Sequence, residues 1–207
     1  MNIQAEVAKQ LLQIKAIKLS PQNPFTWSSG LKSPIYCDNR KILSFPIARN
    51  FIKQALATKS KDFGDFDIVA GVATAGIAHG ALLADALDKP FVYVRNKAKG
   101  HGLKNLIEGH LVGNEKVLVV EDLISTGGSS LKAVEALRAA GTTVIGVLAI
   151  FNYNFDKAAN AFSIANCPYQ TLSNYNALLP IATEMGYVTA ADLTLLQNWR
   201  KNPSNWQ

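Results

Sequence analysis

The sequence contains little cysteine and histidine and has no long apolar run. It has 2 cysteines, Cys37 and Cys167, and 3 histidines among 207 residues. Two isolated cysteines have neither the spacing of zinc ligands nor the density of a disulfide framework. No stretch of about 18 apolar residues is present to span a membrane, and Met1 to Leu12 is too polar for a signal peptide. The sequence therefore predicts a cytoplasmic protein that has no membrane partner.

Two common nucleotide-binding signatures are also absent. No lysine follows Gly127 and Gly128, so the chain has no Walker loop, and it has no Gly-x-Gly-x-x-Gly fingerprint. Internal repeats, low-complexity tracts and linkers are absent as well. A length of 207 residues that are 48% hydrophobic suits a single α/β domain over residues 1–207.

The formal charge is positive, +6, with a pI near 9.3. The basic residues do not form one run and are not interleaved with aromatic residues, as they are in many nucleic-acid-binding chains. A small polyanionic substrate accounts for local positive charge as well as nucleic acid does. We therefore expect no nucleic-acid partner.

Strand-like and helix-like segments alternate from Asp67 onward. Apolar strand patterns at DIVAGV, FVYVR, KVLVVE and TVIGVLAIF are separated by helical patterns at Ala75 to Leu87 and Ser130 to Ala140. Such alternation predicts βαβ units, and hence a central, mainly parallel sheet flanked by helices. The core is expected at about residues 65–155.

The flanking regions are predicted to be helical, apart from one hairpin and one short strand. The N-terminal expectations are an amphipathic helix over about 3–17, a hairpin-like unit over 25–39 and a helix over 45–58. Residues 1–40 would form a small hood. In the tail, we expect helices at 155–164, 175–184 and 190–201 and a short strand at 169–172.

The stretch Val117 to Ser130, VLVVEDLISTGGSS, organises the chain. Val117 to Val120 reads as a strand buried on both faces, and Glu121 and Asp122 stand where it would end. A turn rich in hydroxyls and glycines then leads into a helix, which is a cradle for anions. Carboxylates beside a phosphate cradle indicate a ligand that has both hydroxyls and a phosphate, as a ribose 5-phosphate has.

Two further segments suit anions. GVATAGI, residues 71–77, is a second strand-to-helix turn in which the amides of Thr74 and Ala75 can face a diphosphate. RNKAKGHGLKNLIEG, residues 95–109, carries Arg95, Lys99 and His101 among glycines, as expected of a basic lid that closes over an anionic substrate.

Four motifs together carry a family resemblance. EDLISTGGS, residues 121–129, resembles the phosphoribosyl diphosphate (PRPP) motif of the type I phosphoribosyltransferases. FTWSSGLKSPIYCDNR, GVATAGI and YVRNKAKGHGLKNLIEG resemble, in that order, segments of the orotate phosphoribosyltransferase family. The resemblance runs from about Phe25 to Tyr153.

The resemblance implies the type I phosphoribosyltransferase fold and transfer of a phosphoribosyl group from PRPP to orotate. It implies Mg²⁺ held through substrate oxygens, with no direct protein ligand. It also implies a homodimer in which Lys99 and His101 reach the neighbouring subunit's site. The catalytic residues would be Lys99, His101 and Asp122. The implied PRPP contacts are Thr74, Ala75, Arg95, Lys99, His101, Glu121, Asp122, Leu123, Ile124, Ser125, Thr126, Gly127, Gly128 and Ser129. The implied orotate contacts are Ser29, Gly30, Lys32, Tyr36, Ser125 and Tyr153.

The chain departs from the family pattern at four positions, Ser28, Ala75, Asn96 and Tyr153. The first three stand where many members of the resembled family have lysine, and Tyr153 where some have arginine. These departures indicate either redistributed base and diphosphate contacts or a shifted base preference. Two alternatives stay open at this point. One is a phosphoribosyltransferase for another base, and the other is a PRPP-sensing regulator that binds nucleic acid.

Overall fold

A computed structural model describes residues 2–27, 30–97, 106–203 and 206 of the chain. Its centre is a six-stranded sheet of order β10-β9-β8-β5-β6-β7, in which only β7 is antiparallel to its neighbour. This confirms the predicted α/β class with a mainly parallel sheet. The strands are β5 (Ile68–Val72), β6 (Phe91–Val94), β7 (Ile107–Glu108), β8 (Lys116–Ile124), β9 (Thr143–Asn152) and β10 (Tyr169–Asn174).

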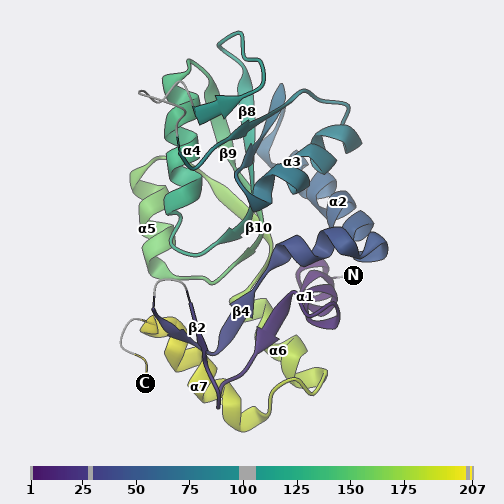
Figure 1. Cartoon of the computed structure of the whole chain (residues 1–207), viewed down its shortest axis with the longest axis vertical. Helices are drawn as coiled ribbons and strands as arrows, with labels where there is room; N and C mark the ends of the chain where they lie inside the picture. Colours follow the sequence, from purple (N-terminus) through teal and green to yellow (C-terminus); the bar gives the residue numbers. More distant parts are fainter. Residues whose placement is uncertain (1, 28–29, 98–105, 204–205, 207) are drawn as a thin grey trace.

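Helices cover both faces of this sheet (Figure 1). Strand β8 shows why, because its alternate residues point to opposite faces. Leu118 and Val120 belong to the apolar cluster that includes α1 (Ile3–Gln13), α2 (Pro46–Ser60) and α3 (Ala75–Ala86). Val117 and Val119 belong to the cluster under α4 (Gly128–Ala139) and α5 (Asp156–Ile164). All four side chains are fully buried, as the unbroken apolar run predicts.

Strand β8 and the first helix end elsewhere than predicted. Strand β8 continues to Ile124, so Glu121 and Asp122 lie inside it rather than at its end. The reason is that β9 runs alongside as far as the pair Ile124–Asn152 and continues the ladder. The first helix ends at Gln13 and not near Ile17, because Ile17 begins β1 and pairs with Cys37.

The hood lies beyond the carboxyl ends of the central strands. It contains the antiparallel pair of β1 (Ile17–Leu19) and β4 (Ile35–Cys37) and the hairpin of β2 (Phe25–Thr26) and β3 (Lys32–Ser33), outside the main sheet as predicted. The short helix η1 (Asn39–Ser44) leads from the hood into α2, and η2 (Lys61–Phe63) follows α2.

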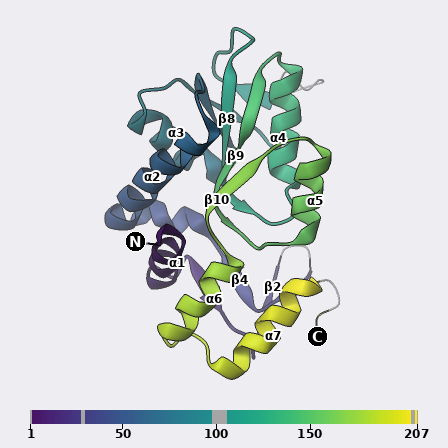
Figure 2. The same ribbon diagram turned by 180° about the vertical axis from the view of Figure 1, so that it is seen from behind.

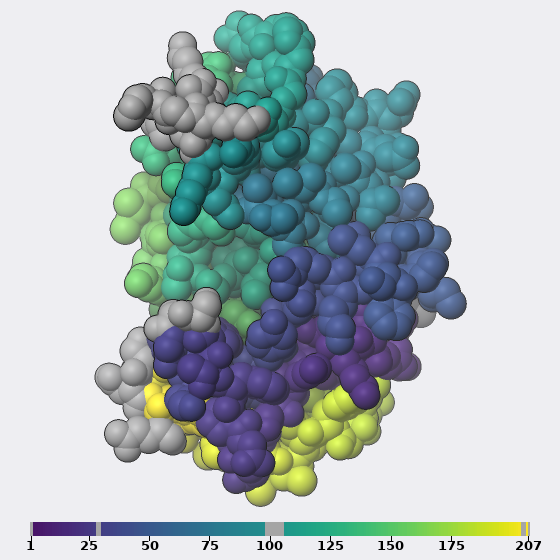
Figure 3. Space-filling view, viewed as in Figure 1, coloured from purple at the N-terminus to yellow at the C-terminus, as the bar shows by residue number. Residues whose placement is uncertain are grey.

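The two C-terminal helices, α6 (Tyr175–Glu184) and α7 (Ala190–Lys201), return to the hood (Figure 2). In the space-filling view, N-terminal and C-terminal segments lie together at one end of the molecule (Figure 3). The fully buried Trp199 of α7 joins them, since its indole N–H donates to the carbonyl of Lys32 at 3.3 Å. Sequence reasoning assigned the hood to the N-terminal segment alone, and the structure adds α6 and α7. Within the described ranges, no helix combines the length and apolar character that crossing a bilayer requires.

Candidate active site

Glu121 lies near the carboxyl end of β8 and is almost completely buried. Its Oε1 accepts the backbone N–H of Asp122 at 3.0 Å, and its Oε2 accepts the hydroxyls of Ser129 at 3.1 Å and Ser130 at 3.2 Å. Burial above all, and then the negative charge of Asp122, raise the pKa of Glu121 from 4.5 to about 8. The two adjacent acids therefore differ in role, since Glu121 holds a proton at neutral pH and braces the turn beyond it.

The turn between β8 and α4 is built to receive an anion. Gly127 has φ of 83°, a left-handed conformation that suits glycine, and α4 starts at the next residue. The first N–H groups of a helix have no partner inside the helix and carry partial positive charge. The turn therefore brings together amides and hydroxyls of the kind that bind phosphate, with the hydroxyl of Ser129 already donating to Glu121.

A cavity of about 340 Å³ lies beside these acids, and we call it the acid cavity. Ala73, Thr74 and Ala75 of the predicted second cradle, residues 71–77, also line it, and the peptide bond between Ala73 and Thr74 is cis. Gly76 permits the close approach of α3 and β8, since a Cβ there would lie 2.6 Å from the carbonyl oxygen of Val120. The full lining is Cys37, Asp38, Arg40, Ala73, Thr74, Ala75, Asn96, Glu121, Asp122, Leu123 and Ser129.

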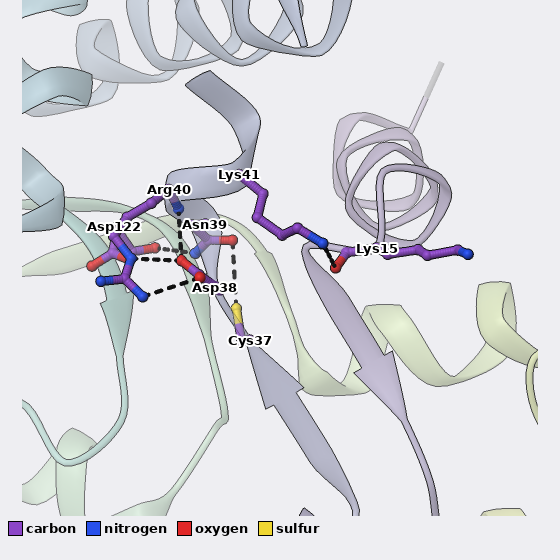
Figure 4. A network of polar contacts seen from close by, with 7 residues as sticks. All are labelled: Lys15, Cys37, Asp38, Asn39, Arg40, Lys41 and Asp122. Carbon is purple, nitrogen blue, oxygen red and sulfur yellow. Dashed lines mark hydrogen bonds and ion pairs between the residues drawn. The ribbon is translucent and has the colours of Figure 1, made fainter. Parts of the chain in front are cut away.

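The start of η1 ties the hood to Asp122 (Figure 4). Asn39 is fully buried, and its amide Nδ2 donates to the backbone carbonyl of Asp122 at 2.7 Å. Its Oδ1 accepts from the thiol of Cys37 at 3.4 Å. On either side, Asp38 and Arg40 form a two-point ion pair, with distances of 2.7 and 3.0 Å. Hydrogen bonding to Arg40 lowers the pKa of Asp38 from its ordinary value.

A second cavity, of about 500 Å³, adjoins the first and shares Cys37 and Leu123 with it. We call it the aromatic cavity. The rings of Trp27 and Tyr153 stack at 5.3 Å on one side, and Tyr36 is 40% exposed. Flat walls of this kind suit a planar ring. Its lining is Thr26, Trp27, Tyr36, Cys37, Leu123, Ser125 and Tyr153.

Comparisons with known proteins show which family the chain belongs to. Residues 40–182 match the model of the phosphoribosyl transferase domain family. The orotate phosphoribosyltransferase of Listeria innocua is 56% identical over 207 residues, which is all of this chain and 99% of that protein. The chain belongs to the orotate phosphoribosyltransferase family. That family transfers a phosphoribosyl group to orotate in pyrimidine biosynthesis, and the relationship decides against another base and against the regulator.

Solved structures of the orotate phosphoribosyltransferase family have the same fold. The enzyme of Aeropyrum pernix matches with a TM-score of 0.76 at 29% identity, over 88% of this chain and 99% of that chain. The enzyme of Mycobacterium tuberculosis, solved in complex with PRPP, matches with a TM-score of 0.66 at 26% identity, over 85% of this chain and 98% of that chain.

Nine of the predicted site residues of this orotate phosphoribosyltransferase family member line the two cavities. Thr74, Ala75, Glu121, Asp122, Leu123 and Ser129 line the acid cavity, and Tyr36, Leu123, Ser125 and Tyr153 line the aromatic cavity. Thr126, Gly127 and Gly128 belong to the turn before α4 and line neither of these two cavities.

Other predicted residues lie apart from both cavities. Arg95 forms an ion pair with Glu108 at 3.2 Å, and its neighbour Asn96 lines the acid cavity instead. The side chain of Ile124 is buried in the core, which leaves only its backbone for a ligand. Gly30 and Lys32 lie on the exposed hairpin, where the ammonium of Lys32 donates to the Thr26 hydroxyl at 2.8 Å.

Three predicted site residues, Ser29, Lys99 and His101, lie outside the described residues. Sequence reasoning missed Asp38, Asn39, Arg40 and Trp27, which all belong to the quoted segment FTWSSGLKSPIYCDNR. The available signal in the sequence was the polar triplet that follows β4. A helix cap accounts for Asp38, and the structure shows in addition that Asn39 is fully buried.

Proposed function

We propose that PRPP binds in the acid cavity and orotate in the aromatic cavity, with the anomeric carbon of PRPP near their shared wall. The observation that carries this proposal is the sharing of Cys37 and Leu123 by the two cavities. The acid cavity offers carboxylates and Ser129 of the anion turn, and the aromatic cavity offers flat aromatic walls and Ser125 of the same turn. A ring nitrogen of orotate and the carbon that it attacks would thus meet at one place.

In this arrangement, the turn Ser125 to Ser129 holds the 5-phosphate through its amides and hydroxyls. Asp122 accepts hydrogen bonds from the ribose hydroxyls and places negative charge near the developing oxocarbenium ion, while Glu121 positions the turn. The amides of Thr74 and Ala75 face the diphosphate. Catalysis then comes from positioning and charge stabilisation, with no covalent step on the protein.

The oxygen-rich acid cavity fits Mg²⁺, a hard cation that prefers carboxylate, phosphate and water oxygens. Asp122 would hold the ion indirectly, through the ribose and diphosphate oxygens that it positions. When bound, the ion neutralises charge on the leaving diphosphate. Arg40, which lines the acid cavity, would add positive charge to the same group.

We propose that Lys99 and His101 complete the neighbouring subunit's site in a homodimer and neutralise the leaving diphosphate. Mixing two inactive variants tests this point. Lys99→Ala and Asp122→Asn remove groups from opposite sides of a shared site, so mixed dimers would contain one intact site and regain activity. Mixtures that stay inactive after subunit exchange would contradict the shared lid.

Orotate consumption, followed by its ultraviolet absorbance, tests the assignment of the two cavities. We expect turnover to require both PRPP and Mg²⁺, and Asp122→Asn to lower kcat by roughly 100-fold or more. The matched control is Asp65→Asn, which removes an exposed carboxylate outside both cavities. Unchanged turnover in Asp122→Asn would refute the role of Asp122.

A further inference from the structure

The aromatic cavity presents a charge problem for its proposed occupant. Orotate carries a carboxylate on its ring, and burying an unpaired carboxylate is costly. Yet none of the described residues that line the aromatic cavity carries a charge at neutral pH. A cation from a neighbouring element must therefore face the ligand, if orotate binds there as proposed.

A third cavity, of about 470 Å³, supplies cations next to the aromatic cavity, and we call it the basic cavity. The two share Trp27 and Ser125 as walls. The basic cavity contains three cationic side chains and one acidic one, so its lining is net positive. These residues are Lys157, Arg200, Lys201 and Asp156, and the other lining residues are Trp27, Leu31, Ser125, Thr126, Phe155 and Pro203.

Among the three cations, Arg200 is the one that the fold holds in place. It is half-buried, whereas Lys157 and Lys201 are exposed. Its Nη1 donates to the backbone carbonyl of Asn154 at 2.8 Å, directly after Tyr153 of the aromatic cavity. A guanidinium has five N–H donors in a planar fork, so this bond is compatible with a two-point contact to a carboxylate.

The residue before Arg200 anchors the last turn of α7 to both cavities. The ring of Trp199 lies 5.8 Å from that of Trp27 and 5.9 Å from that of Tyr153, edge to face in each case. It also lies 5.4 Å from the ring of Phe155, which lines the basic cavity. Fixed packing of this kind restricts where the guanidinium can lie.

We infer that Arg200 recognises the carboxylate of orotate from the boundary between the aromatic and basic cavities, and so determines base specificity. This inference rests on the proposed function and extends it to a residue of the C-terminal helix. The competing cation is Lys32, which lies on the exposed hairpin and whose ammonium donates to the hydroxyl of Thr26, a lining residue of the aromatic cavity.

Binding of two nucleotides that differ only in the carboxylate tests this inference. Orotidine 5′-phosphate has the ring carboxylate and uridine 5′-phosphate lacks it, and calorimetry gives Kd for each. In Arg200→Gln, we expect orotidine 5′-phosphate to bind roughly 10- to 100-fold more weakly, the range for a lost charge-assisted hydrogen bond. Uridine 5′-phosphate should change by less than about twofold, so the discrimination between the two nucleotides collapses.

Three further variants make the result specific. Lys157→Gln removes an exposed cation of the same cavity and should leave the discrimination unchanged. Arg200→Lys keeps the positive charge without the planar fork of donors and should restore part of the discrimination. Lys32→Met, like Lys157→Gln, should leave the discrimination unchanged. Thermal unfolding checks that each variant is folded. If Arg200→Gln does not fold, the nucleotide discrimination of Arg200→Lys tests the inference instead.

Distinct results would overturn the inference. Equal weakening of both nucleotides in Arg200→Gln would place the guanidinium on the 5-phosphate, which both share. Unchanged discrimination would remove Arg200 from recognition, and loss of discrimination in Lys32→Met alone would move that role to the hood. If the wild type consumes orotate, none of these three results contradicts the proposed function. If the wild type does not consume orotate, the proposed function itself is refuted.

Discussion

Glu121 makes the stability of this protein depend on pH in a direction that can be measured. Its carboxyl group is 4% exposed and accepts hydrogen bonds from Ser129, Ser130 and the Asp122 backbone. Burial, followed by the charge of Asp122, raises its pKa to about 8. Glu121→Gln has nearly the same shape and does not titrate; its single amide oxygen can accept either from the Asp122 N–H or from the two serine hydroxyls, and its NH2 group takes the place of the other oxygen.

The sign of the effect follows from proton binding. In the unfolded chain, Glu121 has its ordinary pKa of 4.5. Between pH 4.5 and about 8, the folded protein keeps a proton on Glu121 that the unfolded chain has lost. The free energy of unfolding therefore falls as pH rises through this window, by about 1.4 kcal/mol per pH unit. Across the whole window, the free energy of unfolding falls by roughly 4–5 kcal/mol because of Glu121. Below and above this window, the contribution of Glu121 does not change with pH.

Urea unfolding of wild type and Glu121→Gln at pH 5, 6, 7 and 8, without PRPP or Mg²⁺, measures this contribution. We expect the free energy of unfolding of Glu121→Gln, relative to that of the wild type, to rise by about 1.4 kcal/mol for each pH unit. Glu135→Gln, which removes an exposed carboxylate on α4, is the control for charge removal. A difference between wild type and Glu121→Gln that stays constant with pH, or shrinks, would refute the reasoning.

Three further substitutions test how the site is held together. Asn39→Ala should lower the free energy of unfolding by about 1–2 kcal/mol in urea titrations, since it removes the buried bond to the Asp122 carbonyl, and raise KM for PRPP. No change in either would show that the hood is not coupled through Asn39. Gly76→Ala places a Cβ 2.6 Å from the Val120 carbonyl oxygen and should cost about 1–3 kcal/mol, whereas Gly128→Ala, with nothing within 4 Å, should cost less than about 0.5 kcal/mol. Equal thermal midpoints for these two glycine variants would contradict the close approach of α3 and β8. Trp199→Ala should cost about 3–5 kcal/mol in the same titrations, because it empties a fully buried site. A cost below about 1 kcal/mol would mean that α7 is not anchored by this side chain.

Elements with strong local signals were predicted closely. The helices over 175–184 and 190–201 match α6 and α7 in both bounds. Each begins at a residue whose side chain caps the first turn, Asn174 in one and Thr189 in the other. The prediction that β8 ends at Glu121 and Asp122 was wrong, because pairing with a long neighbouring strand is not visible in the residues of β8 themselves.

Local patterns were enough to predict the parallel sheet, the two glycine-containing strand-to-helix turns and the acids near the end of β8, because alternation, glycine turns and buried apolar runs act over a few neighbouring residues. Which distant residues complete the site depends on tertiary packing. Asn39 meets the carbonyl of Asp122, and Trp199 and Arg200 of the last helix reach the hood and the loop after β9. Such contacts join residues that are far apart in the chain, and they leave no periodic pattern because they depend on how whole elements pack.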